Sequence, residues 1–158
     1  MKHVARAIVL SIGLNAAVSP LMAAEPLIGL WRLQSQEING NVSTDVQPLA
    51  LQINQARGDR LRFAFSVPMP DVYFVTVSYT LRLDGSSADI MDGNNQKVGT
   101  IQMTRSGPGQ YLLTMSGPNK PDSKGKITIS ADGKTLVSES DAVQSGRSVH
   151  SKQTFVRN

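Results

Sequence analysis

The fold class is decided by residues 73–83, which read Tyr73-Phe74-Val75-Thr76-Val77-Ser78-Tyr79-Thr80-Leu81-Arg82-Leu83. Every odd position carries an apolar or aromatic side chain, and all even positions after Phe74 are polar. This period of two buries one face of a strand and leaves the other face in water, as in antiparallel sheets. The stretch therefore predicts a long, half-buried β-strand.

The same alternation recurs on both sides of this stretch, for example at Leu49, Leu51 and Ile53, and no segment after residue 24 shows an apolar stripe at helical spacing. Turn-forming pairs such as Asn39-Gly40 separate the alternating runs. Sequential hairpins of this kind can close into a barrel without free edges. The predicted fold is all-β, a single antiparallel up-and-down β-barrel of about 8–10 strands. The strands are expected at about residues 28–37, 48–55, 60–67, 71–83, 87–91, 97–105, 109–116, 124–131, 134–141 and 147–157.

Residues 1–24 have the composition of an export signal. Lys2 and Arg6 form a basic start, an apolar run extends from Ala7 to about Val18, and small residues end at Ala24. The run is shorter than the roughly 20 apolar residues of a membrane-spanning helix. We expect a signal peptide cleaved after Ala24, a periplasmic or secreted protein, and one barrel domain at residues 25–158.

The composition of the chain bears on which binding partners and which kinds of reactive site it can have. Of 16 basic residues Lys2 and Arg6 lie in the signal, which leaves 14 basic against 12 acidic residues and a net charge of +2. This mild charge is spread along the chain and does not favour a nucleic-acid partner. The chain has no cysteine, which excludes disulfides, thiolate metal sites and a thiol nucleophile. No segment after residue 24 is apolar over the length of a membrane span.

Residues 27–33 read Leu27-Ile28-Gly29-Leu30-Trp31-Arg32-Leu33 and place a Gly-x-Trp motif at the start of the first strand. With a series of hairpins behind it, the motif resembles the opening of calycin-superfamily barrels, which include lipocalins, fatty-acid-binding proteins and avidin-like proteins. The resemblance implies that Gly29 and Trp31 lie at a closed barrel end, where Arg157 of the last strand crosses the indole ring.

The C-terminal half carries a second resemblance. Its run Ser130-Ala131-Asp132-Gly133-Lys134-Thr135-Leu136 is similar to a hairpin of small exported bacterial lipocalin-like proteins. No helical pattern precedes the last strand, which indicates a reduced barrel compared with a lipocalin.

If the odd positions face the interior, they bring together one set of candidate ligand-binding side chains. The set consists of Phe63, Phe65, Tyr73, Tyr79, Met103, Tyr111 and Met115, with Val75 beside it. Aromatic faces suit the packing of an apolar molecule, and tyrosine hydroxyls can orient a polar atom. Ser151 and Gln153 of the last strand would add polar contacts. The alternative is that the same side chains simply fill a small barrel.

No residue pattern indicates catalysis, a metal or a cofactor. His150, the only histidine after residue 24, is expected on a solvated strand face beside Lys152. The chain contains neither a Gly-x-Ser-x-Gly motif nor acidic residues at calcium-loop spacing. We expect no catalytic residues, no metal site and no cofactor.

The leading hypothesis is an exported, non-catalytic protein that binds a small, largely apolar or amphipathic ligand in the barrel. The alternative is a protein-interaction module, such as a periplasmic protease inhibitor. The resemblance to such inhibitors implies that the N-terminal segment Glu25-Pro26-Leu27 inserts into the enzyme.

Two segments interrupt the strand pattern. Pro68-Met69-Pro70 and the polar residues 117–126, which include three lysines, are expected to be loops. They either end solvated hairpins or rim the mouth of a cavity.

Overall fold

The computed structural model describes residues 25–158 apart from residues 71 and 119. The expected signal peptide, residues 1–24, lies outside the described residues. No helix occurs among the described residues, so none there could cross a membrane. The strands in this part of the chain are β1 (Gly29–Ile38), β2 (Asn41–Ser43), β3 (Ala50–Gln55), β4 (Leu61–Pro68), β5 (Tyr73–Leu81), β6 (Ala88–Asp92), β7 (Lys97–Gly107), β8 (Gln110–Gly117), β9 (Lys120–Ile129), β10 (Thr135–Gln144) and β11 (Arg147–Arg157).

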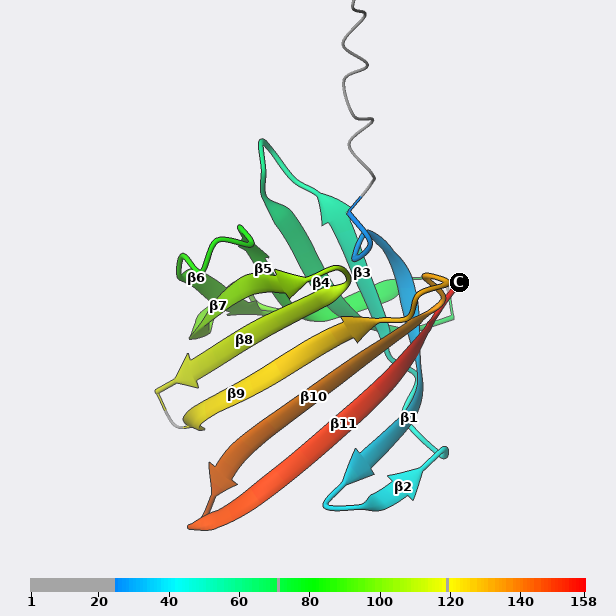
Figure 1. The fold of residues 1–158 in the computed structure, drawn as a ribbon, viewed down its shortest axis with the longest axis vertical. Coiled ribbons are helices and arrows are strands. Elements are labelled where there is room, and N and C mark those ends of the chain that lie inside the picture. Colours follow the sequence, from blue (N-terminus) through cyan, green and yellow to red (C-terminus); the bar gives the residue numbers. More distant parts are fainter. Residues whose placement is uncertain (1–24, 71, 119) are drawn as a thin grey trace, which may run out of the picture.

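These strands close into one antiparallel barrel (Figure 1). From β3 to β11 each strand pairs with the next along the chain, β1 pairs with β3, and β11 returns to pair with β1. The closing ladder runs from Trp31 opposite Arg157 to Ile38 opposite Ser151. The short β2, which the sequence does not predict, pairs with β1 beside the ring. The predicted all-β, up-and-down barrel is confirmed.

The meander gives the barrel two different ends. Because successive strands run in opposite directions, the β3–β4, β5–β6, β7–β8 and β9–β10 turns share one end with the start of β1 and the finish of β11. We call this the closed end. The β1–β2, β4–β5, β6–β7, β8–β9 and β10–β11 turns lie at the opposite, open end. In Figure 1 the β3–β4 turn lies at the top, and the β10–β11 and β1–β2 turns lie at the bottom.

Large side chains fill the closed half of the barrel. Trp31, Phe63, Met103, Tyr111 and Phe155 come from five strands and are at most 1% exposed. They belong to one continuous core cluster. Interiors of this kind are packed as densely as organic crystals, so this half of the barrel leaves little room for a ligand.

The expectation of a long polar loop at residues 117–126 is wrong. β9 begins at Lys120, whose register partner on β8 is Gly117. Lys124 and Lys126 lie on the exposed outer face of β9 and pair with acidic residues of β10. A strand with one solvated face accommodates lysine at every second position, so a high density of lysines does not mark a loop.

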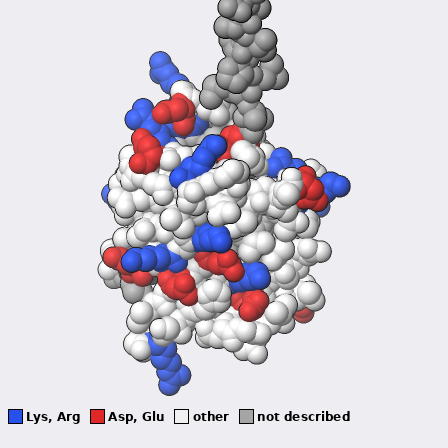
Figure 2. Space-filling model, viewed as in Figure 1, with Lys and Arg blue, Asp and Glu red and all other residues white. Residues whose placement is uncertain are grey.

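The outer face of four adjacent strands carries a row of alternating charges. Glu37, Lys152, Glu139 and Lys126 are successive cross-strand neighbours on β1, β11, β10 and β9. Figure 2 shows acidic and basic side chains interleaved on this side of the molecule. Opposite charges placed directly across strands contribute roughly 0.2–1 kcal/mol per pair. The interleaving also prevents a large patch of one sign from forming here.

Candidate ligand-binding site

Trp31 is held rigidly at the closed end. The side chain is fully buried, and its indole Nε1 donates a hydrogen bond to the Leu27 carbonyl oxygen at 2.9 Å. The Arg157 guanidinium lies 4.3 Å from the ring centroid, which is the arrangement that the calycin resemblance implies. This guanidinium also donates hydrogen bonds of 2.7–2.8 Å to the carbonyl oxygens of Pro26, Ile28 and Gly133. The cation therefore ties the first strand to the last.

Gly29 permits this close approach. A Cβ atom at Gly29 would lie 2.9 Å from Arg157 Nη1 and 3.7 Å from Trp31 Nε1. Three carbonyl hydrogen bonds fix the guanidinium, so it has little freedom to move away. A side chain at this position would disturb the stack of Arg157 on Trp31.

Glu25, which the sequence analysis places in a segment that could insert into an enzyme, lies at the closed end of the barrel. Its carboxylate accepts a hydrogen bond from the Tyr111 hydroxyl and forms an ion pair with Arg105. Burial, followed by the hydrogen bond to Glu25, raises the pKa of Tyr111 above its usual range. Glu25 and Tyr111 lie 86 positions apart in the chain, so no local sequence pattern marks their contact.

These contacts do not support the inhibitor alternative. Leu27 is fully buried, Pro26 accepts a hydrogen bond from Arg157, and the Glu25 side chain is 11% exposed. Insertion of this segment into an enzyme would require all three residues to leave their own barrel.

The inner side chains change in size halfway along β9, β10 and β11. Toward the closed end the inner positions hold Ile127, Ile129, Leu136 and Phe155, all of which are buried. Toward the open end the same face carries mostly small residues, namely Ser123, Gly125, Ser138, Ser140, Ala142 and Ser151, together with Gln144, Val149 and Gln153. Small side chains on one wall leave space that the facing wall does not fill. The barrel is therefore filled in one half and hollow in the other. Of the two alternatives from the sequence, the filled barrel describes the closed half and the ligand pocket describes the open half.

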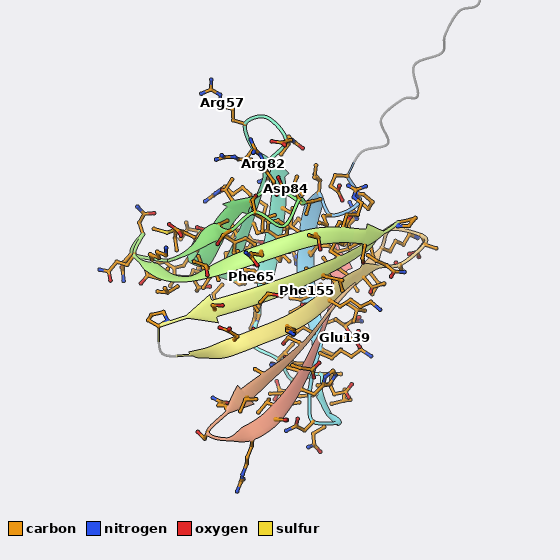
Figure 3. The ribbon with its side chains drawn as sticks, turned by 60° about the vertical axis from the view of Figure 1, so that its left-hand side comes forward. Arg57, Phe65, Arg82, Asp84, Glu139 and Phe155 are labelled. Atoms are coloured by element: carbon orange, nitrogen blue, oxygen red, sulfur yellow. The ribbon has the colours of Figure 1, made fainter. Side chains whose placement is uncertain are left out.

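Two adjoining cavities occupy the hollow half. The inner cavity has a volume of about 160 Å³, and the outer one, of about 470 Å³, lies near the open end. The two adjoin because Val77, Ile90 and Met115 line both. Phe65 and Phe155, which are labelled in Figure 3, line the inner cavity from β4 and β11. Ligand pockets typically have volumes of roughly 300–1,000 Å³, so the space suits a small molecule.

Three of the seven predicted ligand-binding residues, Phe65, Tyr79 and Met115, line the inner cavity. Phe63 and Met103 are fully buried in the filled half instead. The Phe63 ring stacks on Tyr79 with the centroids 4.9 Å apart, so Phe63 supports the cavity wall from behind. Burial raises the pKa of Tyr79 above its usual range.

Tyr73 does not line the interior, contrary to the expectation from alternation. It is 48% exposed and lines a separate hollow beside Pro48 and Pro68. A β-bulge between Phe65 and Ser66 shifts the pairing of β4 with β5, and bulges bend the strand that carries them. Alternation counted along the sequence therefore fails at this end of the hairpin.

Tyr111 faces inward as expected, but it does not contribute a free hydroxyl to the cavity. The ring is fully buried at the closed end, where its hydroxyl donates to Glu25. Tyr111 lines neither cavity of the hollow half, so the structure does not bring it together with Phe65, Tyr79 and Met115.

The polar side of the inner cavity comes from β10 and β11. Gln153, which the sequence analysis includes, lines the cavity with Ser138 and Ser140, which it does not. The signal that could have identified these serines is their spacing, because they alternate with Glu139 and Asp141 along one strand. Ser151 lies on the same face and hydrogen-bonds to Ser140, with 2.9 Å between the two Oγ atoms.

His150 lies on the outer face, as expected. Its Nδ1 is 2.8 Å from Asp141 Oδ1, and both side chains are well exposed. The serines next to this pair in sequence, Ser140 and Ser151, bond to each other on the inner face. Among residues 25–158 other than 71 and 119, no three His, Asp or Glu side chains come together as a metal site.

A larger hollow, of about 670 Å³, lies on the outer surface of β4–β6. Arg60, Arg62 and Arg82 line it together with serine and threonine residues. Arg82 is already paired with the exposed Asp59, at 2.9 Å. The cavities inside the barrel are the better candidates because they are less open to solvent than this hollow and mostly apolar.

Several solved structures have the same fold as this chain. Zebrafish ileal bile acid-binding protein, complexed with cholic acid, is 21% identical and superposes with a TM-score of 0.58, covering 85% of this chain and 100% of that chain. Two variants of the fluorescent protein UnaG are 14% and 15% identical, with TM-scores of 0.57 and 0.58. They cover 84% and 85% of this chain, and 96% and 98% of their own chains are matched. No protein-family model matches the chain, and no curated protein matches it either. The likeness at these identities is one of fold, and that fold is a calycin-type β-barrel.

Proposed function

We propose that the protein binds a small, largely apolar or amphipathic molecule inside the hollow half of the barrel, without catalysis. The observation that carries this proposal is the enclosed cavity between two well-packed walls, lined mainly by apolar side chains such as Leu51, Val77 and Leu113. Burying apolar ligand surface there stabilises a complex by about 25 cal/mol per Å².

The shared fold gives secondary support. Zebrafish ileal bile acid-binding protein holds cholic acid, an amphipathic molecule, on the same architecture. One fold can host many functions, so the proposal depends on the cavity rather than on this likeness.

The distribution of exposed apolar side chains indicates how a ligand reaches the cavity. Of the nine large apolar side chains that are strongly exposed in the described part of the chain, all but Leu112 lie near the open end. They are Ile38, Val42, Met69, Val72, Tyr73, Phe74, Val98 and Val143. We call these eight residues the apolar rim. Exposed apolar patches commonly mark sites of contact with ligands or partners.

Export belongs to the same proposal. The composition of residues 1–24 supports cleavage after Ala24 and a periplasmic or secreted location. The intact mass of the protein isolated from each compartment of its host tests this. A mature chain that begins at Glu25 outside the cytoplasm is expected, and a cytoplasmic protein that retains residues 1–24 would overturn it.

Ligand binding is tested with the neutral fluorescent probe N-phenylnaphthylamine. We expect a saturable rise in fluorescence with the wild-type protein. Val77→Trp places a large ring where Val77 lines both cavities, and it should weaken probe binding at least about tenfold, which corresponds to about 1.4 kcal/mol.

The matched control is Thr80→Trp, on the exposed face of the same strand. It should bind the probe like the wild type and unfold at the same temperature. Absence of saturable binding by the folded wild type, or equal loss in both variants, would contradict the proposed function.

A further inference from the structure

The polar groups of the inner cavity lie on one wall. Ser138 and Ser140 of β10 and Gln153 of β11 line it, and Ser138 is the direct cross-strand neighbour of Gln153. Apart from Tyr79, the other residues that line this cavity are apolar. A serine hydroxyl and a glutamine amide each donate and accept hydrogen bonds. The wall can therefore satisfy a hydroxyl, a carbonyl or an amide.

The described residues that line the two cavities include no charged side chain. Along β10 and β11, Glu139, Asp141 and Lys152 alternate with the inner serines and Gln153, so they occupy the outer face. Figure 3 labels Glu139 on β10 and Phe155 on β11, and only Phe155 lines the inner cavity. Among the described residues, therefore, no lysine or arginine lines either cavity to pair with a ligand carboxylate.

The cations of the closed end are already engaged. Arg105 pairs with Glu25, and Arg157 donates to three carbonyl oxygens beneath Trp31. Neither arginine lines a cavity of the hollow half. An ionised carboxylate buried in the inner cavity would lose its hydration without gaining a counter-charge, which is strongly unfavourable.

We propose that the ligand places an uncharged polar group against Ser138, Ser140 and Gln153, and that the cavity selects neutral amphiphiles over carboxylates of the same chain length. This inference rests on the proposed function and specifies the class of ligand. The ligand's apolar body contacts the facing wall, which Phe65, Val77 and Met115 contribute.

The test compares decanol with decanoate, which share their chain length and differ in head-group charge. Each competes with N-phenylnaphthylamine for the wild-type protein at neutral pH. We expect decanol to displace the probe at a concentration at least about tenfold below that of decanoate, a difference of about 1.4 kcal/mol. Acidification should narrow the gap, because a protonated carboxyl group is neutral.

A variant pair locates the effect. Gln153→Arg introduces a cation at the polar wall and should shift the preference toward decanoate, whereas Gln153→Leu should weaken decanol binding and leave decanoate weak. Thr154→Val, on the outer face of the same strand, is the control and should keep the wild-type preference. If Gln153→Arg does not fold, Ser140→Lys supplies the same charge nearer the open end.

The outcomes separate the two proposals. A folded wild-type protein that binds no probe overturns the proposed function and this inference together. Saturable probe binding with equal displacement by decanol and decanoate at neutral pH keeps the function and overturns the inference. An unchanged preference in both Gln153→Arg and Ser140→Lys also overturns it.

Discussion

The two ends of the barrel use the same strands for opposite purposes. At the closed end, Trp31 and Leu27 are fully buried, and Arg157 is bound to three carbonyl oxygens. At the open end most inner residues of β9, β10 and β11 are small, and the apolar rim is exposed. The difference is set along each strand by the size of the inner side chains and requires no separate domain.

The comparison teaches that stability and binding are carried by different residues of one sheet. Substitutions at the closed end should therefore act on unfolding, and substitutions at the open end should act on the ligand. Four substitutions and a change of pH test this separation, beginning with the substitution that should cost most stability.

Trp31→Ala should have the largest effect on stability. Truncation of a fully buried aromatic side chain commonly costs about 3–5 kcal/mol. That is a large part of the roughly 5–15 kcal/mol that stabilises a domain. Chemical denaturation measures the loss. Val143→Ala, at a half-exposed residue of the open end, is the control and should change stability little. Equal effects of the two variants would break the comparison.

Arg157→Gln should have an intermediate effect. The variant loses the cation over Trp31, worth about 0.5–2 kcal/mol, and hydrogen bonds to carbonyl oxygens. Because Arg157 is partly solvated, we expect a total loss of about 1–3 kcal/mol by denaturation. Arg147→Gln, at the exposed first residue of β11, changes the same charge and should leave stability unaltered. A similar loss in both would mean that net charge, rather than the closed end, is responsible.

Alkaline pH should destabilise the protein through its buried tyrosines. The pKa of Tyr79 is raised above its usual value of 10.0 by burial, so above that pH the unfolded state loses a proton that the folded state retains. Stability is thus complete below pH 10 and falls above it, by at most about 1.4 kcal/mol per pH unit for each such group.

Tyr79→Phe removes one of these groups, so its stability should decline less steeply above pH 10 than that of the wild type. Denaturation curves recorded at a series of alkaline pH values measure the slope. Tyr73→Phe, at a half-exposed tyrosine of the open end, is the control. A wild-type slope in Tyr79→Phe would show that this hydroxyl does not distinguish the folded from the unfolded state.

Met69→Ser should have the smallest effect on stability, within about 0.5 kcal/mol, because Met69 is more than half exposed. The same substitution should lower the association rate of N-phenylnaphthylamine, since Met69 belongs to the apolar rim. Stopped-flow fluorescence measures that rate. Leu112→Ser, at the exposed apolar residue away from the rim, should leave the rate unchanged. Equal association rates in the two variants would show that the probe does not enter the cavity past the apolar rim.

The sequence predicts the barrel well because alternation and turns are local signals. The long run at residues 73–83 and the paired turn residues place most strands within a few positions of those observed. The resemblance carried by the Gly29-x-Trp31 motif also implies that Arg157 lies over the Trp31 ring, and in the structure the guanidinium does lie over that ring.

The cavity is harder to predict because it depends on register. Alternation does not reveal the bulge between Phe65 and Ser66, so it predicts Tyr73 inside the barrel, whereas the residue is 48% exposed. The Tyr111 hydroxyl is held by a hydrogen bond to Glu25, which lies 86 positions earlier in the sequence. The change from Leu136 and Phe155 to serines becomes meaningful only when neighbouring strands are aligned side by side.

The ladder between β1 and β11 has a consequence for the order of folding. Every other pair in the ring joins strands that are close in sequence, but this one closes a loop of more than a hundred residues, from Trp31 to Arg157. Closing a long loop is entropically unfavourable and slow compared with hairpin formation. Until β11 is in place, β1 and β10 each keep an unpaired edge that can recruit another chain. We therefore expect sealing of the barrel to be the last step, so that both edges stay open to another chain until the ladder between β1 and β11 forms.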